Sequence, residues 1–131
     1  MSWINETLAE FGRQMGLSNF GPGMHGVAQL RLESGALLAV ESVQRGRADE
    51  VLVCFAQPLG FDAENLRRRA LEKVHFSHGG PYPIQIATRG DGSQTMLLML
   101  IRLQDRAFTV QTLSHAVDYL NRWFDELREG R

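Results

Sequence analysis

Two kinds of apolar spacing alternate along this chain, and their order constrains the fold most. The last segment shows helical spacing most clearly, with apolar side chains at steps of four and three residues: Leu113, Val117, Leu120, Phe124 and Leu127. Similar spacing predicts helices near residues 3–15 and 63–75, and alternating or apolar runs predict strands near 27–33, 36–43, 51–56, 84–89 and 95–103. The order α-β-β-β-α-β-β-α predicts an α+β fold, with three helices on a mainly antiparallel five-stranded sheet.

Capping and turn residues support these bounds. Ser2, Asp62 and Thr109 are expected N-caps, because a short polar side chain can accept a free backbone N–H at the start of a helix. Gly16 is expected to end the first helix in the left-handed conformation. Gly90-Asp91-Gly92-Ser93 predicts a hairpin turn rather than a phosphate loop, since no Lys-Ser/Thr pair or helix follows it.

Composition indicates one ordinary globular domain over residues 1–131. The net charge is −1, from 14 basic and 15 acidic residues, so no electrostatic signature of nucleic-acid binding is present. The single cysteine, Cys54, excludes an intrachain disulfide. The first residues lack the pattern of a signal peptide, and the longest apolar run, Met96–Ile101, is too short to span a bilayer. We therefore expect a cytoplasmic protein without integral membrane contact.

Three groups contain residue types that are common in metal or catalytic sites, but their spacing or surroundings do not fit such a site. His75 and His78 are three residues apart, but no further ligand completes a metal shell. Cys54 lies in an apolar strand, where cysteine usually acts as a small hydrophobic residue. Ser114 and His115 are helical neighbours about 100° apart, so they and Asp118 cannot form a triad. We expect no enzymatic activity, no metal and no cofactor.

Three consecutive arginines, Arg67-Arg68-Arg69, form a local basic run on the second helix. Successive helical residues fan around the axis, so the three cannot form one patch. A solvated face is expected, and one of the three could pair with an acidic group on a partner.

The strongest strand, Thr95–Leu103, is apolar on both faces. Three helices on a five-stranded sheet most naturally cover one face and the edges, so part of this surface needs another cover. An excess of apolar surface is also expected near Trp3 on the first helix and near Trp123 on the last. Two accounts remain open: a thick core within one chain, or a surface covered by a second chain. The alternating residues on the two faces are Leu97, Met99, Ile101 and Leu103 against Met96, Leu98 and Leu100.

The element order resembles that of the class I chaperones of bacterial type III secretion systems. The opening Met1-Ser2-Trp3-Ile4, followed by Phe11 and Met15-Gly16-Leu17, is similar to the SycN-like members, as are the Ser34-Gly35-Ala36-Leu37 turn and the last helix. The resemblance implies a dimeric chaperone without ATPase activity. It implies pairing with a second small chaperone (YscB-like) and binding of the N-terminal region of a YopN-like gatekeeper, with a role in secretion and its regulation.

The same resemblance places two sets of residues. It implies a dimer interface on the second helix and the strands after it, which here means Leu66, Ala70, Leu71, Val74, Leu98 and Leu100. It implies client contacts on the first helix and first strand, here Trp3, Ile4, Phe11, Met15, Leu30 and Leu32. The implied location is the cytoplasm, including the cytoplasmic side of the secretion apparatus at the inner membrane.

Two alternatives stay open. One is a homodimeric chaperone of the same class that serves a secreted effector. The other, from a different class, is an enzyme or small-ligand domain with a cavity lined by His25, His75 or His115.

Overall fold

The structure of the chain is a computed structural model. It describes residues 2–17, 20–21, 27–32, 35–45, 48–76 and 82–130; within these ranges, the side chains of residues 2, 3, 44, 45, 48 and 76 are not described. The expected positions of His25 and His78 lie outside the described residues, and so does the side chain of Trp3.

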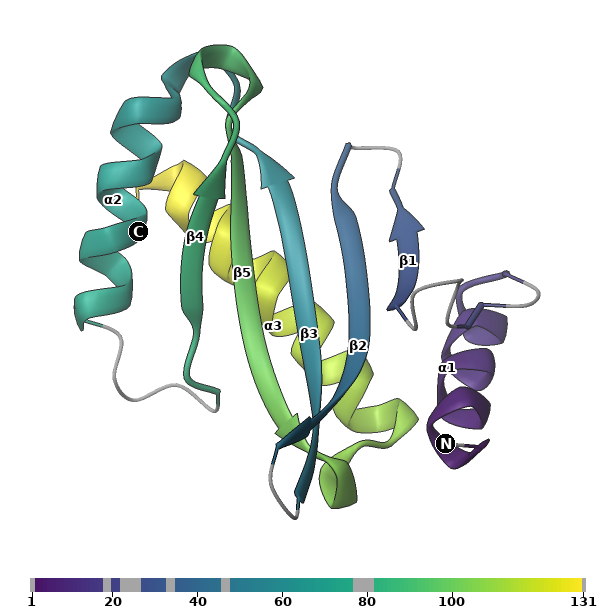
Figure 1. Ribbon diagram of the computed structural model, residues 1–131. Coiled ribbons are helices and arrows are strands. Elements are labelled where there is room, and N and C mark those ends of the chain that lie inside the picture. The colour runs from purple at the N-terminus through teal and green to yellow at the C-terminus, as the bar shows by residue number, and fades with distance from the viewer. Residues whose placement is uncertain are drawn as a thin grey trace.

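The predicted element order is confirmed (Figure 1). Within the described ranges, three α-helices and five strands follow one another as expected, with short 3-10 turns before α2, between β4 and β5, and before α3. Their bounds are α1 Ser2–Gln14, β1 Val27–Arg31, β2 Leu37–Arg45, β3 Ala48–Pro58, α2 Ala63–Phe76, β4 Gln85–Arg89, β5 Met96–Gln104 and α3 Val110–Glu129.

All strand pairs in the sheet are antiparallel, in the order β1-β2-β3-β5-β4. β3 lies at the centre, which confirms its prediction as an interior strand. It is longer than its apolar run because the hairpin with β2 extends to Arg45↔Ala48, and polar residues there pair as readily as apolar ones. β1 and β4 form the two edges of the sheet.

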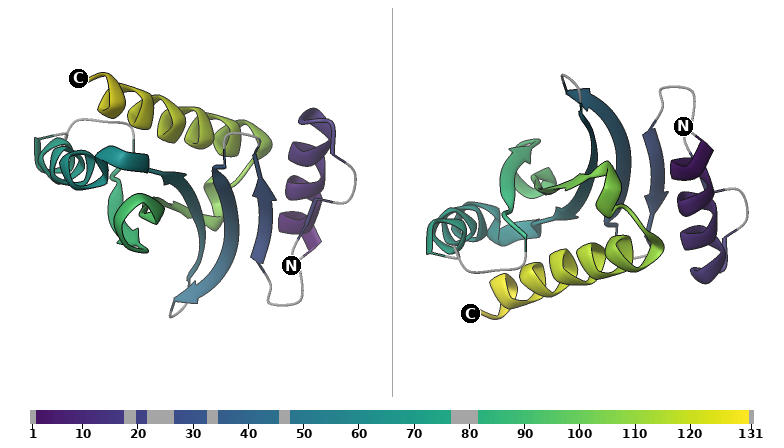
Figure 2. Two further views of the ribbon diagram at one scale, coloured as in Figure 1. Left: turned by 90° about the horizontal axis from the view of Figure 1, so that it is seen from above. Right: turned by 90° about the horizontal axis from the view of Figure 1, so that it is seen from below.

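The three helices occupy different positions around this sheet. α3 crosses one face, α1 lies beyond the β1 edge and α2 lies beyond the β4 edge (Figures 1 and 2). The described helices leave the opposite face uncovered. The expectation that helices cover one face and the edges is confirmed.

The core lies between the sheet and α3. In β5, alternate residues are buried while their neighbours are only half-buried, as expected for a strand with one covered face. α3 contributes Trp123 and Phe124, both buried within this chain, so the expected excess near Trp123 is covered by the chain itself. The other buried residues of α3 are Leu113, Ala116, Leu120 and Leu127.

Local chemistry explains where the helices begin and end. The Thr109 side chain accepts a hydrogen bond from the Thr112 backbone N–H, and the Thr112 hydroxyl accepts one from the Thr109 N–H. This reciprocal pair satisfies two free donors at the start of α3. Gly130 ends α3 and Gly16 follows α1, each with a positive φ, of 85° and 82°.

Candidate partner-binding surfaces

Cys54, His75 and His115, which belong to the three groups tested above for chemistry, lie on three different elements. Cys54 is half-buried on the sheet face away from α3, and burial raises the pKa of its thiol. His75 and His115 are exposed on different helices. Among the described residues, no three His, Cys, Asp or Glu side chains lie close enough together to hold a metal ion. No described helix is long and apolar enough to cross a membrane.

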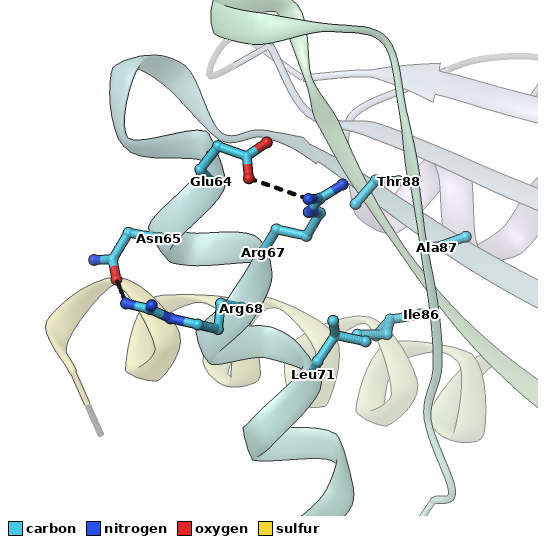
Figure 3. Close-up of a pocket in the computed structure, with 8 residues that line it drawn as sticks. All are labelled: Glu64, Asn65, Arg67, Arg68, Leu71, Ile86, Ala87 and Thr88. Atoms are coloured by element: carbon cyan, nitrogen blue, oxygen red, sulfur yellow. Dashed lines mark hydrogen bonds and ion pairs between the residues drawn. The ribbon is translucent and has the colours of Figure 1, made fainter.

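A groove of about 720 Å³ lies between α2 and the edge strand β4 (Figure 3). Its apolar part is made by Leu71 of α2 and Ile86 of β4, whose side chains approach each other across the groove. Leu71 is 58% exposed, so its side chain is open to a partner. The other lining residues are Glu64, Asn65, Arg67, Arg68, Ala87 and Thr88.

Helical geometry brings four of these residues together. Positions 64, 67, 68 and 71 are three or four residues apart, so they share one face of α2. Arg67 Nη2 lies 3.1 Å from Glu64 Oε2 and forms an ion pair with it. Arg68 Nη2 donates a hydrogen bond to Asn65 Oδ1 at 3.1 Å. Arg69 lies outside the groove, because its guanidinium lies close to Gly130 at the end of α3. As predicted, the three arginines of the Arg67–Arg69 run do not form one patch.

The six predicted dimer-interface residues lie in three places. Leu66 and Ala70 are buried in the core of this chain, and Val74 is partly buried against it. Leu71 faces the groove, because it lies off the row formed by the other three. Leu98 and Leu100 are half-buried on the uncovered face of the sheet. Of these six, Leu71 is the one exposed residue, and Leu98 and Leu100 are the two on the uncovered face.

On the uncovered face, Leu98 and Leu100 belong to a continuous apolar region. The register pairs Leu98 with Ala56 of β3, and it pairs Leu100 with Cys54. Ala39 of β2 pairs with Cys54 in turn, so apolar side chains cross three strands at the same level. One end of this face is polar: Arg102 lies 3.6 Å from Glu50 and donates a hydrogen bond to Gln85.

The predicted client residues are also divided. Ile4 and Phe11 are buried, and they hold α1 against the rest of the chain. Leu30 and Leu32 are partly buried and pack against the core. Met15, at the end of α1, is 48% exposed and is the most accessible of the five described members.

Sequence reasoning missed two features. It passed over Ile86, Ala87 and Thr88 as members of a surface, because a short edge strand with mixed letters carries no apolar signal of its own. It also passed over Phe61, which is fully exposed in the turn before α2. Phe61 lies between Gly60 and Asp62, outside any helical or strand spacing of apolar residues. That position was the available sign that its side chain could be exposed.

The chain matches the family model described as type III secretory system chaperone SycN over residues 3–128. This covers nearly every described element. The chain belongs to the SycN family of type III secretion chaperones. None of the curated proteins compared with the chain matches it significantly.

Three solved structures have a fold similar to that of this chain. The Yersinia pestis chaperone SycH, solved with a fragment of YscM2, is 13% identical with a TM-score of 0.66; the match covers 95% of this chain and 98% of that one. A chain of the HopA1–SchA chaperone–effector complex is 15% identical with a TM-score of 0.60, covering 95% and 91%. A chain of the ExsC–ExsE complex is 15% identical with a TM-score of 0.63, covering 97% and 92%. At these identities the likeness establishes the fold of this SycN-family chain.

Proposed function

We propose that this chain is one half of a heterodimeric chaperone. In this proposal it pairs in the cytoplasm with a second small chaperone, which is YscB-like. The pair holds the N-terminal region of a YopN-like gatekeeper until the gatekeeper is exported. The heterodimer would thereby support secretion of the gatekeeper and regulation of the secretion system. The observation that carries the proposal is apolar surface left open in a chain of the SycN family: Leu71 in the groove and Leu98 and Leu100 on the uncovered sheet face.

Pairing would use Leu71, Leu98 and Leu100, with Leu66, Ala70 and Val74 supporting α2 from beneath. Burying a leucine side chain contributes about 1.5–3 kcal/mol relative to leaving it exposed. A few such residues can hold a dimer together once the costs of association are met. No catalytic group is needed for this function, because the free energy comes from removing apolar surface from water.

Client binding would use the α1 end of the molecule. Met15 is exposed there, Leu30 and Leu32 are only partly covered, and Ile4 and Phe11 fix α1 in place. We include Trp3 in this surface by its position in the first turn of α1. An unfolded client segment loses conformational entropy on binding, so its apolar side chains must bury enough surface to exceed that loss. Methionine suits such a site because its flexible side chain adapts to varied partners.

The experiment is co-expression of the tagged chain with the second small chaperone and the first part of the gatekeeper. The proposal predicts that both are retained through purification in equal amounts. It also predicts that limited proteolysis of the gatekeeper segment slows when the chaperone pair is present. Retention of neither protein would contradict the proposal.

A homodimeric chaperone for an effector is the second candidate, and the structural likeness to a chain of the HopA1–SchA chaperone–effector complex favours it. The two candidates differ in the behaviour of the chain alone. A homodimer would have twice the mass of 14.7 kDa in sedimentation at micromolar concentration, whereas one half of a heterodimer would not.

A further inference from the structure

The groove between α2 and β4 combines an apolar centre with an excess of positive charge. We propose that Arg68 selects the partner here. The groove accepts a different chain that brings a carboxylate beside an apolar side chain, and it disfavours a second copy of this chain. This inference rests on the proposed pairing through α2 and names the chemistry of the partner.

The hydrogen bonds of the two arginines differ. Arg67 already has a carboxylate partner, Glu64, at 3.1 Å. Arg68 donates instead to the neutral amide oxygen of Asn65, at 3.1 Å. A guanidinium carries five N–H donors in a planar fork that matches a carboxylate, so Arg68 retains the capacity for a bidentate ion pair. Figure 3 shows its side chain extended sideways from α2 toward Asn65, away from Leu71, so the guanidinium lies at the rim of the groove and not at its apolar centre.

Charge counting separates the two kinds of partner. The lining holds two guanidiniums and one carboxylate, so one positive charge is left over. A symmetric dimer uses the same patch on both subunits, and a second copy would therefore bring a second uncompensated guanidinium. Like charges brought together in a desolvated interface are unfavourable, whereas a carboxylate on a different chain would compensate Arg68.

Geometry suggests the form of the partner segment. β4 pairs only with β5 among the described strands, so the side of its backbone facing the groove has no strand partner. Ala87 and Thr88 on this strand are exposed. An extended segment can add to such an edge through backbone hydrogen bonds, and every second side chain then points to the same side. An apolar side chain of such a segment would pack beside Leu71, and an acidic side chain near the rim of the groove would pair with Arg68.

Two synthetic peptides test the proposal on the full chain. Both have serine at alternate positions; the intervening positions alternate leucine with glutamate in one peptide and leucine with lysine in the other. Fluorescence anisotropy at about 50 mM salt, where surface charges are weakly screened, measures their binding. We expect the glutamate peptide to bind at least about tenfold more tightly, which corresponds to 1.4 kcal/mol.

Variants assign this preference to one side chain. Arg68→Gln should abolish the preference for glutamate, and Arg68→Glu should reverse it. The matched control is Arg106→Gln, an exposed arginine in the turn after β5 that does not line the groove. It should behave like the wild type. Circular dichroism and an unchanged thermal midpoint establish that each variant is folded.

Self-association provides the second measurement. If Arg68 disfavours a second copy, Arg68→Gln should dimerise several-fold more tightly than the wild type in sedimentation velocity. The proposal is overturned if the glutamate peptide does not bind, if both peptides bind alike, or if Arg68→Gln leaves both measurements unchanged. Those results would leave the proposed function standing if the chain still co-purified with a partner through Leu71. If the chain co-purified with no partner but still preferred the glutamate peptide, the proposed heterodimer would be contradicted and the charge selectivity of the groove would stand.

Discussion

Lys73 Nζ lies 3.1 Å from Glu126 Oε1, and this ion pair connects α2 to α3. The same ammonium lies 5.4 Å from the centre of the Trp123 ring, within the range of a cation–π contact. The Lys73 side chain is 15% exposed, so the pair is more sheltered than an ordinary surface pair. Since α2 also carries Leu71, this contact helps to set where the proposed partner surface lies.

We predict that Lys73→Met lowers the free energy of unfolding by on the order of 1–2 kcal/mol. The substitution keeps an apolar stem but removes the charge opposite Glu126 and above Trp123. Urea unfolding followed by circular dichroism measures the change in midpoint. Arg13→Met is the matched control, because its ion pair with Glu10 is exposed at both ends and should contribute about 0–1 kcal/mol. Equal effects of the two substitutions would contradict the role given to Lys73.

Gly12 allows Phe20 to fold back onto α1. A Cβ at position 12 would lie 2.4 Å from the Phe20 Cβ, closer than real contacts allow, and the Phe20 ring packs 6.1 Å from that of Phe11. Gly12→Ala should therefore destabilise the chain by about 1–3 kcal/mol despite the higher helix propensity of alanine. Gly21→Ala is the control, since that position faces open space. Thermal unfolding compares them, and a more stable Gly12→Ala variant would show that the close approach is absent.

The Thr109 cap predicts a smaller effect. Thr109→Ala removes the side chain that accepts the Thr112 N–H, so the free energy of unfolding should fall by about 1 kcal/mol. Gln111→Ala, at an exposed site in the first turn of α3, should be close to neutral. Chemical denaturation of both variants is the measurement. A loss at position 111 as large as that at position 109 would argue against the cap.

Cys54 gives a prediction in pH. Burial raises the pKa of its thiol, so the folded chain holds this proton to higher pH than the unfolded chain does. The resulting stabilisation is complete below the unfolded pKa, about 8.5, and is lost as pH rises through the higher folded pKa. Between pH 8 and 10, the free energy of unfolding should therefore fall more steeply in the wild type than in Cys54→Ala. Equal slopes of the free energy of unfolding against pH in the two proteins would contradict the raised pKa of Cys54. Alkylation at pH 8 should also be slower than for an exposed thiol.

Most of the fold was predictable because apolar periodicity is a direct record of burial. The apolar run of β5 and the four-three spacing of α3 predicted both elements, and the spacing of α3 also predicted its buried face. The two-residue extension of β3 at Pro58 was not predictable, because strand ends are set by pairing with β2 and β5 rather than by their own letters.

The candidate site was only partly predictable. The resemblance to the type III chaperones implies one interface that contains Leu71 together with Leu66 and Ala70. In the structure, a difference of one residue in phase places Leu71 in the groove and the other two in the core. The β4 side of that groove, including Ile86, depends on which strand lies at the edge of the sheet. The pairing of the strands in the folded chain decides this. The resemblance to the type III chaperones supplied the role of α2, which periodicity alone did not.

The most direct test of the account is the pairing of Leu71→Glu with the second small chaperone, measured by light scattering after co-expression. Asn121→Glu, which adds the same charge at an exposed position of α3, is the matched control. We expect the wild type and Asn121→Glu to purify as dimers, whereas folded Leu71→Glu should purify as a monomer because pairing would bury its carboxylate. A folded Leu71→Glu variant that pairs as tightly as the wild type would contradict it.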